Sequence, residues 1–149
     1  MNKEKLAEAL RYRFGGQEIG ESFGFPMLQV EKEQLYHDAH ILLSEEPFRF
    51  DMLVCETAVD RNDYFELVCH LRSVAEGHEM ILKTRVERGE MPVLASLCGL
   101  WQAAELFEDE VYDLFGIYFE HHPFLRRIMM DDDFQGYPLR KDFVNVEEL

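Results

Sequence analysis

Two adjacent histidines near the C-terminus are the residues whose types could bind a metal ion. His121 and His122 follow Glu120, and a run of acids follows at Asp131–Asp133. Imidazole and carboxylate groups together suit zinc or iron. Adjacent side chains in an extended chain point to opposite sides, however, and the sequence has no helical pair of histidines spaced four residues apart. The pattern favours a histidine turn before Pro123 over a metal site.

The cysteine, serine and glycine patterns offer no other catalytic or cofactor-binding motif. Cys55, Cys69 and Cys98 are odd in number and widely spaced, whereas iron-sulfur clusters and zinc sites need closely spaced thiols. No serine has the context of a nucleophile elbow, and no glycine-rich phosphate loop follows a strand. We interpret the cysteines as buried thiols and expect no catalytic residue, cofactor or metal ion in this chain.

A cluster of acids around position 110 is more informative than the histidines. Apolar residues recur every three or four positions over residues 97–114, which predicts a helical segment. At 100° per residue, Glu108 and Glu110 flank the apolar side of this helix, whereas Asp109 and Asp113 point away from it. Acids in flanking positions lie at the edge of a contact. Gly116 is the residue type that ends a helix in the left-handed conformation.

The chain beyond this helix is aperiodic, apolar and basic. Prolines and a glycine interrupt it, so it is not one regular element, and we interpret it as an ordered tail laid across another surface. Arginines amid apolar residues favour pairing with carboxylates. The hypothesis is that Glu108, Glu110 and Asp113 pair with Arg126, Arg127, Arg140 and Lys141, or with cations of a partner. Exposed salt bridges of little energetic value remain the alternative.

Short helices and strands are expected before this region, and they must position it. Apolar residues at helical spacing predict helices over residues 3–14 and 31–46. Residues 23–30 are typical of an extended segment, and alternating apolar residues predict strands over 50–59, 64–71 and 78–87. The first two of these strands are joined by residue types that suit a hairpin turn.

These elements predict an α+β fold organised as a single domain. We expect a mostly antiparallel sheet with helices packed on one face and an irregular C-terminal docking tail. The α+β domain would cover residues 1–119, and the extended tail would cover residues 120–149. The chain of 149 residues is long enough to bury a core.

Composition restricts the class of partner. The net charge of -15 would repel phosphate backbones and anionic lipids, so nucleic acid is not an expected partner. No window approaches the roughly 20 apolar residues of a membrane helix, and the first residues lack the apolar stretch of a secretory signal. We expect a cytoplasmic protein that reaches a membrane only as part of a complex.

The end of the chain resembles a known family. Residues 108–128 resemble the signature of the C-type (30 kDa-type) subunit of the proton-pumping NADH:quinone oxidoreductase, respiratory complex I, which runs E-R-E-x-x-D-[LM]-F-G-[IV]-x-F-x-G-H-P-x-L-R-R-[IL]. Residues 134–143 look like the ending F-x-G-[HY]-P-L-R-K-D-[FY] of that family. Weaker resemblance covers residues 50–53, 57–60 and 68–71. Two positions depart from the signature: Asp109 stands where Arg is usual, and His121 stands where Gly is usual.

The resemblance implies a cofactor-free, non-catalytic subunit of the hydrophilic arm, peripheral on the cytoplasmic side of the inner membrane. It would dock the quinone-site large subunit (D type) and the iron-sulfur subunit (B type) for electron transfer from NADH to quinone coupled to ion translocation. FMN and iron-sulfur clusters would belong to partner subunits. The expected partner-docking residues are Glu108, Glu110, Asp113, His122, Arg126, Arg127, Arg140, Lys141 and Asp142.

Three alternatives to this interpretation are kept. Homologous subunits occur in membrane-bound [NiFe] hydrogenases, formate hydrogenlyase complexes and deazaflavin-dependent dehydrogenase complexes, so the same part could serve another machine. A stand-alone enzyme would use His121, His122 and the nearby acids. An acidic adaptor unconnected with electron transfer is the third class.

Overall fold

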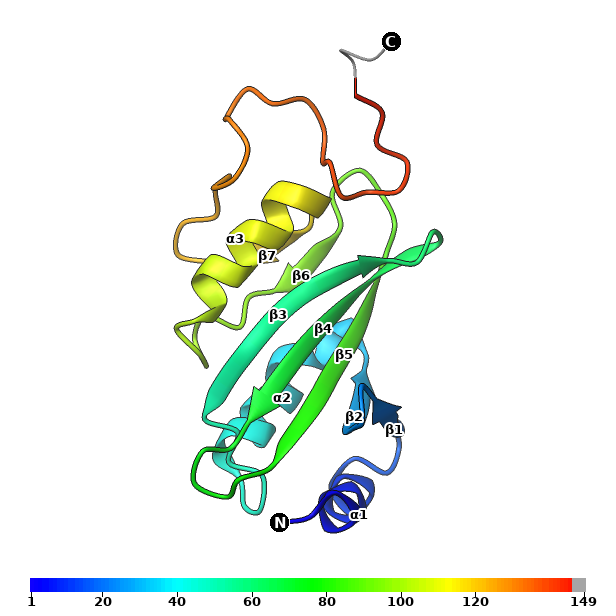
Figure 1. Cartoon of the computed structure of the whole chain (residues 1–149), viewed down its shortest axis with the longest axis vertical. Helices are drawn as coiled ribbons and strands as arrows, with labels where there is room; N and C mark the ends of the chain where they lie inside the picture. Colours follow the sequence, from blue (N-terminus) through cyan, green and yellow to red (C-terminus); the bar gives the residue numbers. More distant parts are fainter. Residues whose placement is uncertain (146–149) are drawn as a thin grey trace.

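A computed structural model describes residues 1–145 and contains two sheets and three α-helices (Figure 1). The helices are α1 (Lys3–Arg13), α2 (Leu35–Ser44) and α3 (Ala104–Phe115), with a short 3-10 helix η1 (Lys32–Gln34) before α2. The strands are β1 (Glu18–Ser22), β2 (Phe25–Val30), β3 (Met52–Asp60), β4 (Tyr64–Arg72), β5 (Glu79–Glu87), β6 (Val93–Ala95) and β7 (Tyr118–Glu120).

The larger sheet has the strand order β1-β2-β5-β4-β3. All neighbours are antiparallel except β2 and β5, which are parallel and are connected through η1, α2 and the β3–β4 hairpin. The register of β3 shifts between Leu53 and Cys55, where the strand has an irregularity. Beyond it, Glu56 pairs with Cys69 and Ala58 with Leu67, so Glu56 shares the face of these apolar residues.

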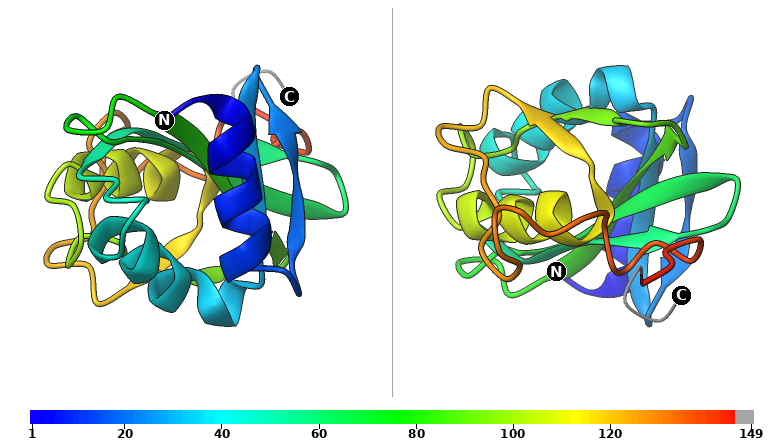
Figure 2. Two further views of the ribbon diagram at one scale, coloured as in Figure 1. Left: turned by 90° about the horizontal axis from the view of Figure 1, so that it is seen from below. Right: turned by 90° about the horizontal axis from the view of Figure 1, so that it is seen from above.

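That face of the sheet is covered by the helices, as Figure 2 shows from two ends. One core cluster joins Leu6 and Leu10 of α1, Leu42 of α2 and Val111 of α3 to sheet residues such as Leu67. The opposite face carries a second, smaller cluster of three buried residues, Met27, Val68 and Ile81. The predicted α+β fold, with a mostly antiparallel sheet and helices on one face, is confirmed.

Several boundaries differ from the predictions. The last helix begins at Ala104 rather than near position 97, because the backbone of residues 97–101 forms turns that place Trp101 in the core, where its indole N–H donates to the carbonyl of Phe50 at 2.9 Å. Strands β1, β6 and β7 were not predicted. Each has five residues or fewer, too short for a clear alternation of apolar and polar side chains.

The tail turns back over α3 after β7 and then crosses toward the β3–β4 hairpin (Figure 1). No helix among the described residues is long and apolar enough to cross a membrane. The division of the chain at residue 120 stays a prediction, and residues 146–149 of the predicted tail lie outside the described residues.

Candidate functional site

Helix α3 presents a row of buried carboxylates to the tail and to the preceding loop. Glu108 and Asp113 are 0% exposed and Asp109 is 1% exposed, whereas Glu110 is exposed. The helix ends at Gly116, whose φ of 75° is left-handed and whose N–H donates to the carbonyl of Tyr112 at 2.8 Å. Carboxylates in such positions are stable only when hydrogen-bonded, so their partners define the site.

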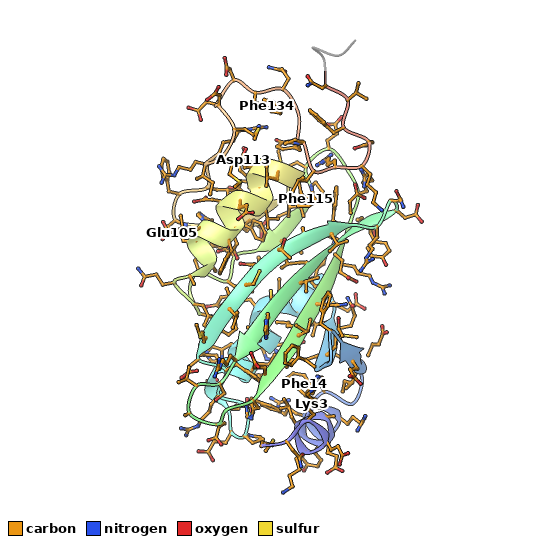
Figure 3. The ribbon with its side chains drawn as sticks, viewed as in Figure 1. Lys3, Phe14, Glu105, Asp113, Phe115 and Phe134 are labelled. Carbon is orange, nitrogen blue, oxygen red and sulfur yellow. The ribbon has the colours of Figure 1, made fainter. Side chains whose placement is uncertain are left out.

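Asp113 fixes the middle of the tail through three consecutive main-chain N–H groups. Its Oδ2 accepts hydrogen bonds from Ile128, Met129 and Met130 at 3.1, 2.6 and 2.9 Å. The guanidinium of Arg127 lies 3.5 Å from its Oδ1. Figure 3 shows Asp113 on α3 below this part of the tail. One carboxylate therefore replaces the regular hydrogen bonding that an aperiodic segment lacks.

Asp109 and His122 fix the start of the tail. Asp109 Oδ1 accepts the main-chain N–H of Arg126 at 3.3 Å and lies 3.5 Å from the His122 ring. Burial raises the pKa of Asp109, against the lowering effects of the Arg126 N–H and His122. The His122 ring also contacts the carbonyl of Glu105 at 2.9 Å and accepts the N–H of Phe124 at 3.0 Å.

These contacts show what two of the acids face. We expected Asp109 and Asp113 to point away from the apolar side of the helix, and the structure buries both under the chain's own tail. The prediction assumed that only the apolar side of the helix is buried, whereas the sheet covers one side of α3 and the tail covers another. His121, at the second departure from the signature, has a φ of 69°, so a side chain there adopts the conformation that glycine favours.

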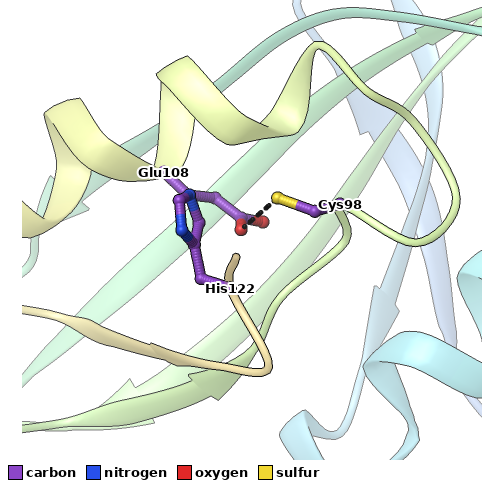
Figure 4. Close-up of side chains that lie close together, drawn as sticks. All are labelled: Cys98, Glu108 and His122. Carbon is purple, nitrogen blue, oxygen red and sulfur yellow. Dashed lines mark hydrogen bonds between the residues drawn. The ribbon is translucent and has the colours of Figure 1, made fainter. Parts of the chain in front are cut away.

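Glu108 was expected at the edge of a contact, paired with a cation of the tail or of a partner, but it is fully buried and the described residues pair it with other groups. Its carboxylate accepts hydrogen bonds from Ser96 Oγ at 2.6 Å and from the N–H of Leu97 at 2.9 Å. The Cys98 thiol donates to the same carboxylate at 3.4 Å (Figure 4). The loop before α3 thus supplies the partners, and it is close in space because it leads into the helix through tight turns.

A second carboxyl, Glu56 of β3, lies against Glu108 in the core. Glu56 is 2% exposed, and its pKa is raised well above the usual value, first by burial and then by the neighbouring Glu108. Burial likewise raises the pKa of the Cys98 thiol to about 12, and the same two carboxyls contribute. These raised pKa values favour the neutral forms of the Glu56 carboxyl and the Cys98 thiol.

Arg127 and Arg140 point into the tail instead of toward solvent. Arg127 donates to the carbonyl of Gly136 at 2.8 Å and lies 4.9 Å from the centre of the Tyr137 ring. Arg140 donates to the carbonyl of Phe115 and stacks between Phe65 and Tyr137, 5.1 Å from each ring centre. These guanidinium groups hold the tail in shape.

Asp60, at the end of β3, fixes the last part of the tail. Its Oδ2 accepts the main-chain N–H of Lys141 at 2.8 Å, and its Oδ1 pairs with Arg88. Arg88 in turn lies 3.0 Å from Asp142. Burial alone would raise the pKa of Asp60, but the hydrogen bonds from Arg88, Lys141 and Asn62 outweigh it and lower the pKa to about 2.

Substitution of Asp60 by asparagine is expected to remove an acid-sensitive contribution to stability. The pKa falls from 3.8 to about 2 on folding, so the carboxylate stabilises the fold above pH 4, and this contribution is lost as the pH falls from about 4 to 2. A shift of this size corresponds to about 2 kcal/mol at neutral pH. Urea denaturation of both proteins across pH 2–7 measures the difference. Asn at the exposed Asp63 is the control, and equal pH profiles for all three proteins would contradict the assignment.

The structure divides the nine predicted docking residues into two sets. Five are turned toward the protein: Glu108, Asp113, His122, Arg127 and Arg140. Four are exposed at the surface of α3 and the tail: Glu110, Arg126, Lys141 and Asp142. Sequence reasoning missed Asp60, Arg88 and Ser96, which lie far from the tail in the sequence or carry no recognisable motif.

Apolar side chains accompany the exposed charges on the outer surface of the tail. Phe124 is 63% exposed, Met129 58%, Leu139 53% and Ile128 41%. Arg126 lies over the Phe124 ring, 5.1 Å from its centre. A tail that is anchored through its main chain and turns large apolar side chains outward has the character of an interaction surface. We call these residues, with Arg126 and Lys141, the outer tail surface.

Fold and site together define a class of small α+β proteins whose acidic helix is covered by the protein's own C-terminal segment. The family described as "Respiratory-chain NADH dehydrogenase, 30 Kd subunit" matches residues 28–148. The chain belongs to this family, as the signature in residues 108–143 indicated.

Relatives with assigned names agree with the family. The chain is 38% identical over 142 residues to the C-type subunit of the NADH-quinone oxidoreductase of Moorella thermoacetica, a match that covers 94% of each chain. It is 37% identical over 144 residues to the corresponding subunit of Geotalea uraniireducens, covering 95% of this chain and 82% of the relative. In the Verminephrobacter eiseniae relative, 40% identical over 118 residues, the match spans 72% of this chain and only 58% of the relative's length.

A solved structure shares the fold. A chain in the structure of the membrane-bound sulfane sulfur reductase, described as an archaeal respiratory membrane complex, superimposes with a TM-score of 0.76 at 26% sequence identity. The match covers 97% of this chain and 87% of that one. The fold therefore also occurs in a second kind of respiratory complex.

Proposed function

We propose that this chain is a non-catalytic docking subunit, without a redox cofactor, of the hydrophilic arm of an NADH:quinone oxidoreductase. The observation that carries the proposal is the outer tail surface, where Phe124 and Arg126 face outward while the main chain is fixed to α3. Membership of the 30 Kd family supports the host complex. Electrons would pass from NADH to quinone through FMN and iron-sulfur clusters held by partner subunits, coupled to ion translocation.

The proposed partners are the quinone-site large subunit, of the D type, and the neighbouring iron-sulfur subunit, of the B type. The chain would be peripheral on the cytoplasmic side of the membrane. Glu110, Arg126, Lys141 and Asp142 are the exposed charges that would meet partner residues. The five residues of the predicted set that are turned toward the protein would act indirectly, because they hold the tail in the conformation that the partners bind.

The mechanical role follows from this division of residues. Electron transfer depends on fixed distances between redox groups, so a subunit that bridges two partners must not deform. The tail is fixed at Asp109, Asp113 and Asp60, three points spread along its length. Anchors at these points would let the outer tail surface act as a rigid spacer between partner subunits.

A double substitution in the outer tail surface, Phe124→Asp with Arg126→Glu, is expected to weaken assembly. The side chains of both residues project outward, so the fold should persist while the contact is lost. Loss of one interface hot spot corresponds to roughly a tenfold or greater decrease in affinity. The tagged variant would be expressed in place of the wild-type chain, and the measurement is co-purification of the large and iron-sulfur subunits, together with NADH:quinone reductase activity of the membranes.

The matched control makes the same changes on α1, at the opposite end of the molecule (Figure 1). Tyr12 is 94% exposed and Arg11 is exposed, so Tyr12→Asp with Arg11→Glu makes an equal change in charge and a similar change in apolar area. Only the tail variant should lose partners, with both circular dichroism spectra unchanged. Normal recovery of both subunits and full activity in the tail variant would show that the docking proposal is wrong.

One observation supports a different complex as the host of this subunit: a chain of the archaeal sulfane sulfur reductase complex has the same fold. The same docking role could then operate in a hydrogenase-type, formate hydrogenlyase-type or deazaflavin-dependent complex. Purification of the complex from its native membrane distinguishes the hosts. A flavin subunit that oxidises NADH supports the first proposal, whereas nickel in the large subunit supports a hydrogenase.

A further inference from the structure

Three side chains that can bind metals meet beside α3, although they come from three separate segments of the chain. Cys98 comes from the loop before the helix, Glu108 from the helix and His122 from the start of the tail (Figure 4). Each offers a sulfur, oxygen or nitrogen atom, and these atoms all lie within 4.8 Å of one another. The sequence spacing predicted no metal site, because the three come from separate elements and only one of them is a cysteine.

A fourth donor lies next to this group. Glu56 of β3 lies beside Glu108 and is 2% exposed, and apart from this neighbouring carboxyl neither of its oxygens has a hydrogen-bond partner among the described residues. No Lys or Arg side chain of residues 1–145 forms an ion pair with Glu56 or Glu108. A buried carboxyl without a partner is costly, and a cation between the two carboxyls would remove that cost.

We propose that Cys98, Glu108 and His122 bind a divalent transition-metal ion of the zinc class, with Glu56 as the fourth ligand. A thiolate, an imidazole and two carboxylates are a ligand set that suits zinc and gives it four protein ligands. Cys98 directs its S–H at Glu108, and the ion would take the place of that hydrogen. The thiol proton and any proton carried by Glu56 leave to solvent as the bonds to the metal form, and no residue is oxidised or reduced.

Entry to the site is possible from the side of Cys98, which is only half-buried. His122 already uses both ring nitrogens, one near the carbonyl of Glu105 and one accepting the N–H of Phe124. Binding therefore replaces one of these contacts by a metal bond, and the other contact keeps the ring oriented, as is common for metal-binding histidines. The ion would join the start of the tail to the helix and to β3, and this role is independent of the docking proposal.

Cobalt(II) is the probe for the test, because a thiolate bound to it produces a charge-transfer absorption band. The metal-free full-length chain is titrated with Co²⁺, and we expect one equivalent to bind with such a band, which Zn²⁺ then displaces. Cys98→Ser should abolish the band. Cys98→Ser should also weaken Zn²⁺ binding by at least about 100-fold, because loss of a direct ligand lowers the affinity more than loss of a residue that only contacts a ligand.

Two further variants separate binding from folding. Cys55→Ser is the matched control, because Cys55 pairs with His70 on the opposite face of β3 and β4 from Glu56 and Cys69. It should keep the band. His122→Gln should lose Zn²⁺ affinity, and also the rise in melting temperature that Zn²⁺ causes in the wild type. No saturable Co²⁺ binding by the wild type, or an equal band in Cys98→Ser and the wild type, would overturn the proposal.

Discussion

The Asp113→Asn variant is expected to release the middle of the tail from α3 and to lose on the order of 3 kcal/mol of stability. Oδ2 of Asp113 accepts the N–H groups of Ile128, Met129 and Met130, and its carboxylate is 0% exposed. An amide oxygen carries no full charge, and the amide NH₂ would face the guanidinium of Arg127. The neutral amide oxygen would therefore hold the three N–H groups more weakly, and the NH₂ group would leave Arg127 without its anionic neighbour.

Two measurements check this expectation. Chemical denaturation reports the free energy of unfolding, and limited proteolysis reports release of residues 120–143 even where the domain stays folded. Glu110→Gln is the control, because Glu110 is on the same helix but exposed, and its change should stay within about 0.5 kcal/mol. Equal stability and equal cleavage of Asp113→Asn and the control would show that the three hydrogen bonds do not hold the tail.

The Gly116→Ala variant is expected to destabilise the protein by about 2–4 kcal/mol, because two effects add. Gly116 has a φ of 75°, which costs an L-residue roughly 1–2 kcal/mol. A Cβ atom there would also lie 2.6 Å from the Tyr137 ring and 2.8 Å from the guanidinium of Arg140. These neighbours are held by stacking on each other, so the tail must move away from the helix end.

Gly77→Ala separates the two effects. Gly77 has nearly the same φ, 73°, but a Cβ atom there would meet nothing within 4 Å. Its variant therefore shows the conformational strain alone, and the difference between the two free energies of unfolding measures the close approach of the tail. The account of Gly116 fails if the two alanine variants are equally stable.

The regular elements could be predicted from the sequence because their patterns are local. Alternation from Tyr64 to Leu71 and the three-and-four repeat that includes Val111 specify a strand and a helix without knowledge of the rest of the chain. In the structure β4 ends at Arg72, one residue after the predicted end, and the helix begins at Ala104, later than predicted. The parallel pairing of β2 with β5 had no local signal, since it depends on how the intervening elements pack.

The site was less predictable than the fold. The acidic helix and the basic tail were found, but the pairing was assigned to side chains, whereas most anchors are main-chain N–H groups that no sequence pattern reveals. Asp113 near Arg127 agrees with the hypothesis of pairing, and Glu108 with Ser96 and Leu97 does not. A helix covered on two sides has acids in buried as well as exposed positions, so the helical period alone does not tell which of its acids are buried.

The structure shows how the two residues that depart from the family signature, Asp109 and His121, fit into the fold. Asp109, which replaces the usual arginine, is placed to accept the N–H of Arg126 and to lie beside His122. The left-handed φ of His121 shows that the backbone keeps the glycine-like turn with a side chain present. The docking role of the nine predicted residues stays a proposal, now concentrated on the four that are exposed.

Anchoring through the main chain makes the outer surface of the tail exchangeable. The carboxylates of Asp109, Asp113 and Asp60 hold amide groups that every residue except proline possesses, so they are indifferent to which side chains follow. Outward residues such as Phe124 and Met129 could be replaced without loss of the anchors. A single scaffold could in this way be refitted to a different complex by changing a few surface residues, while its fold stays as it is.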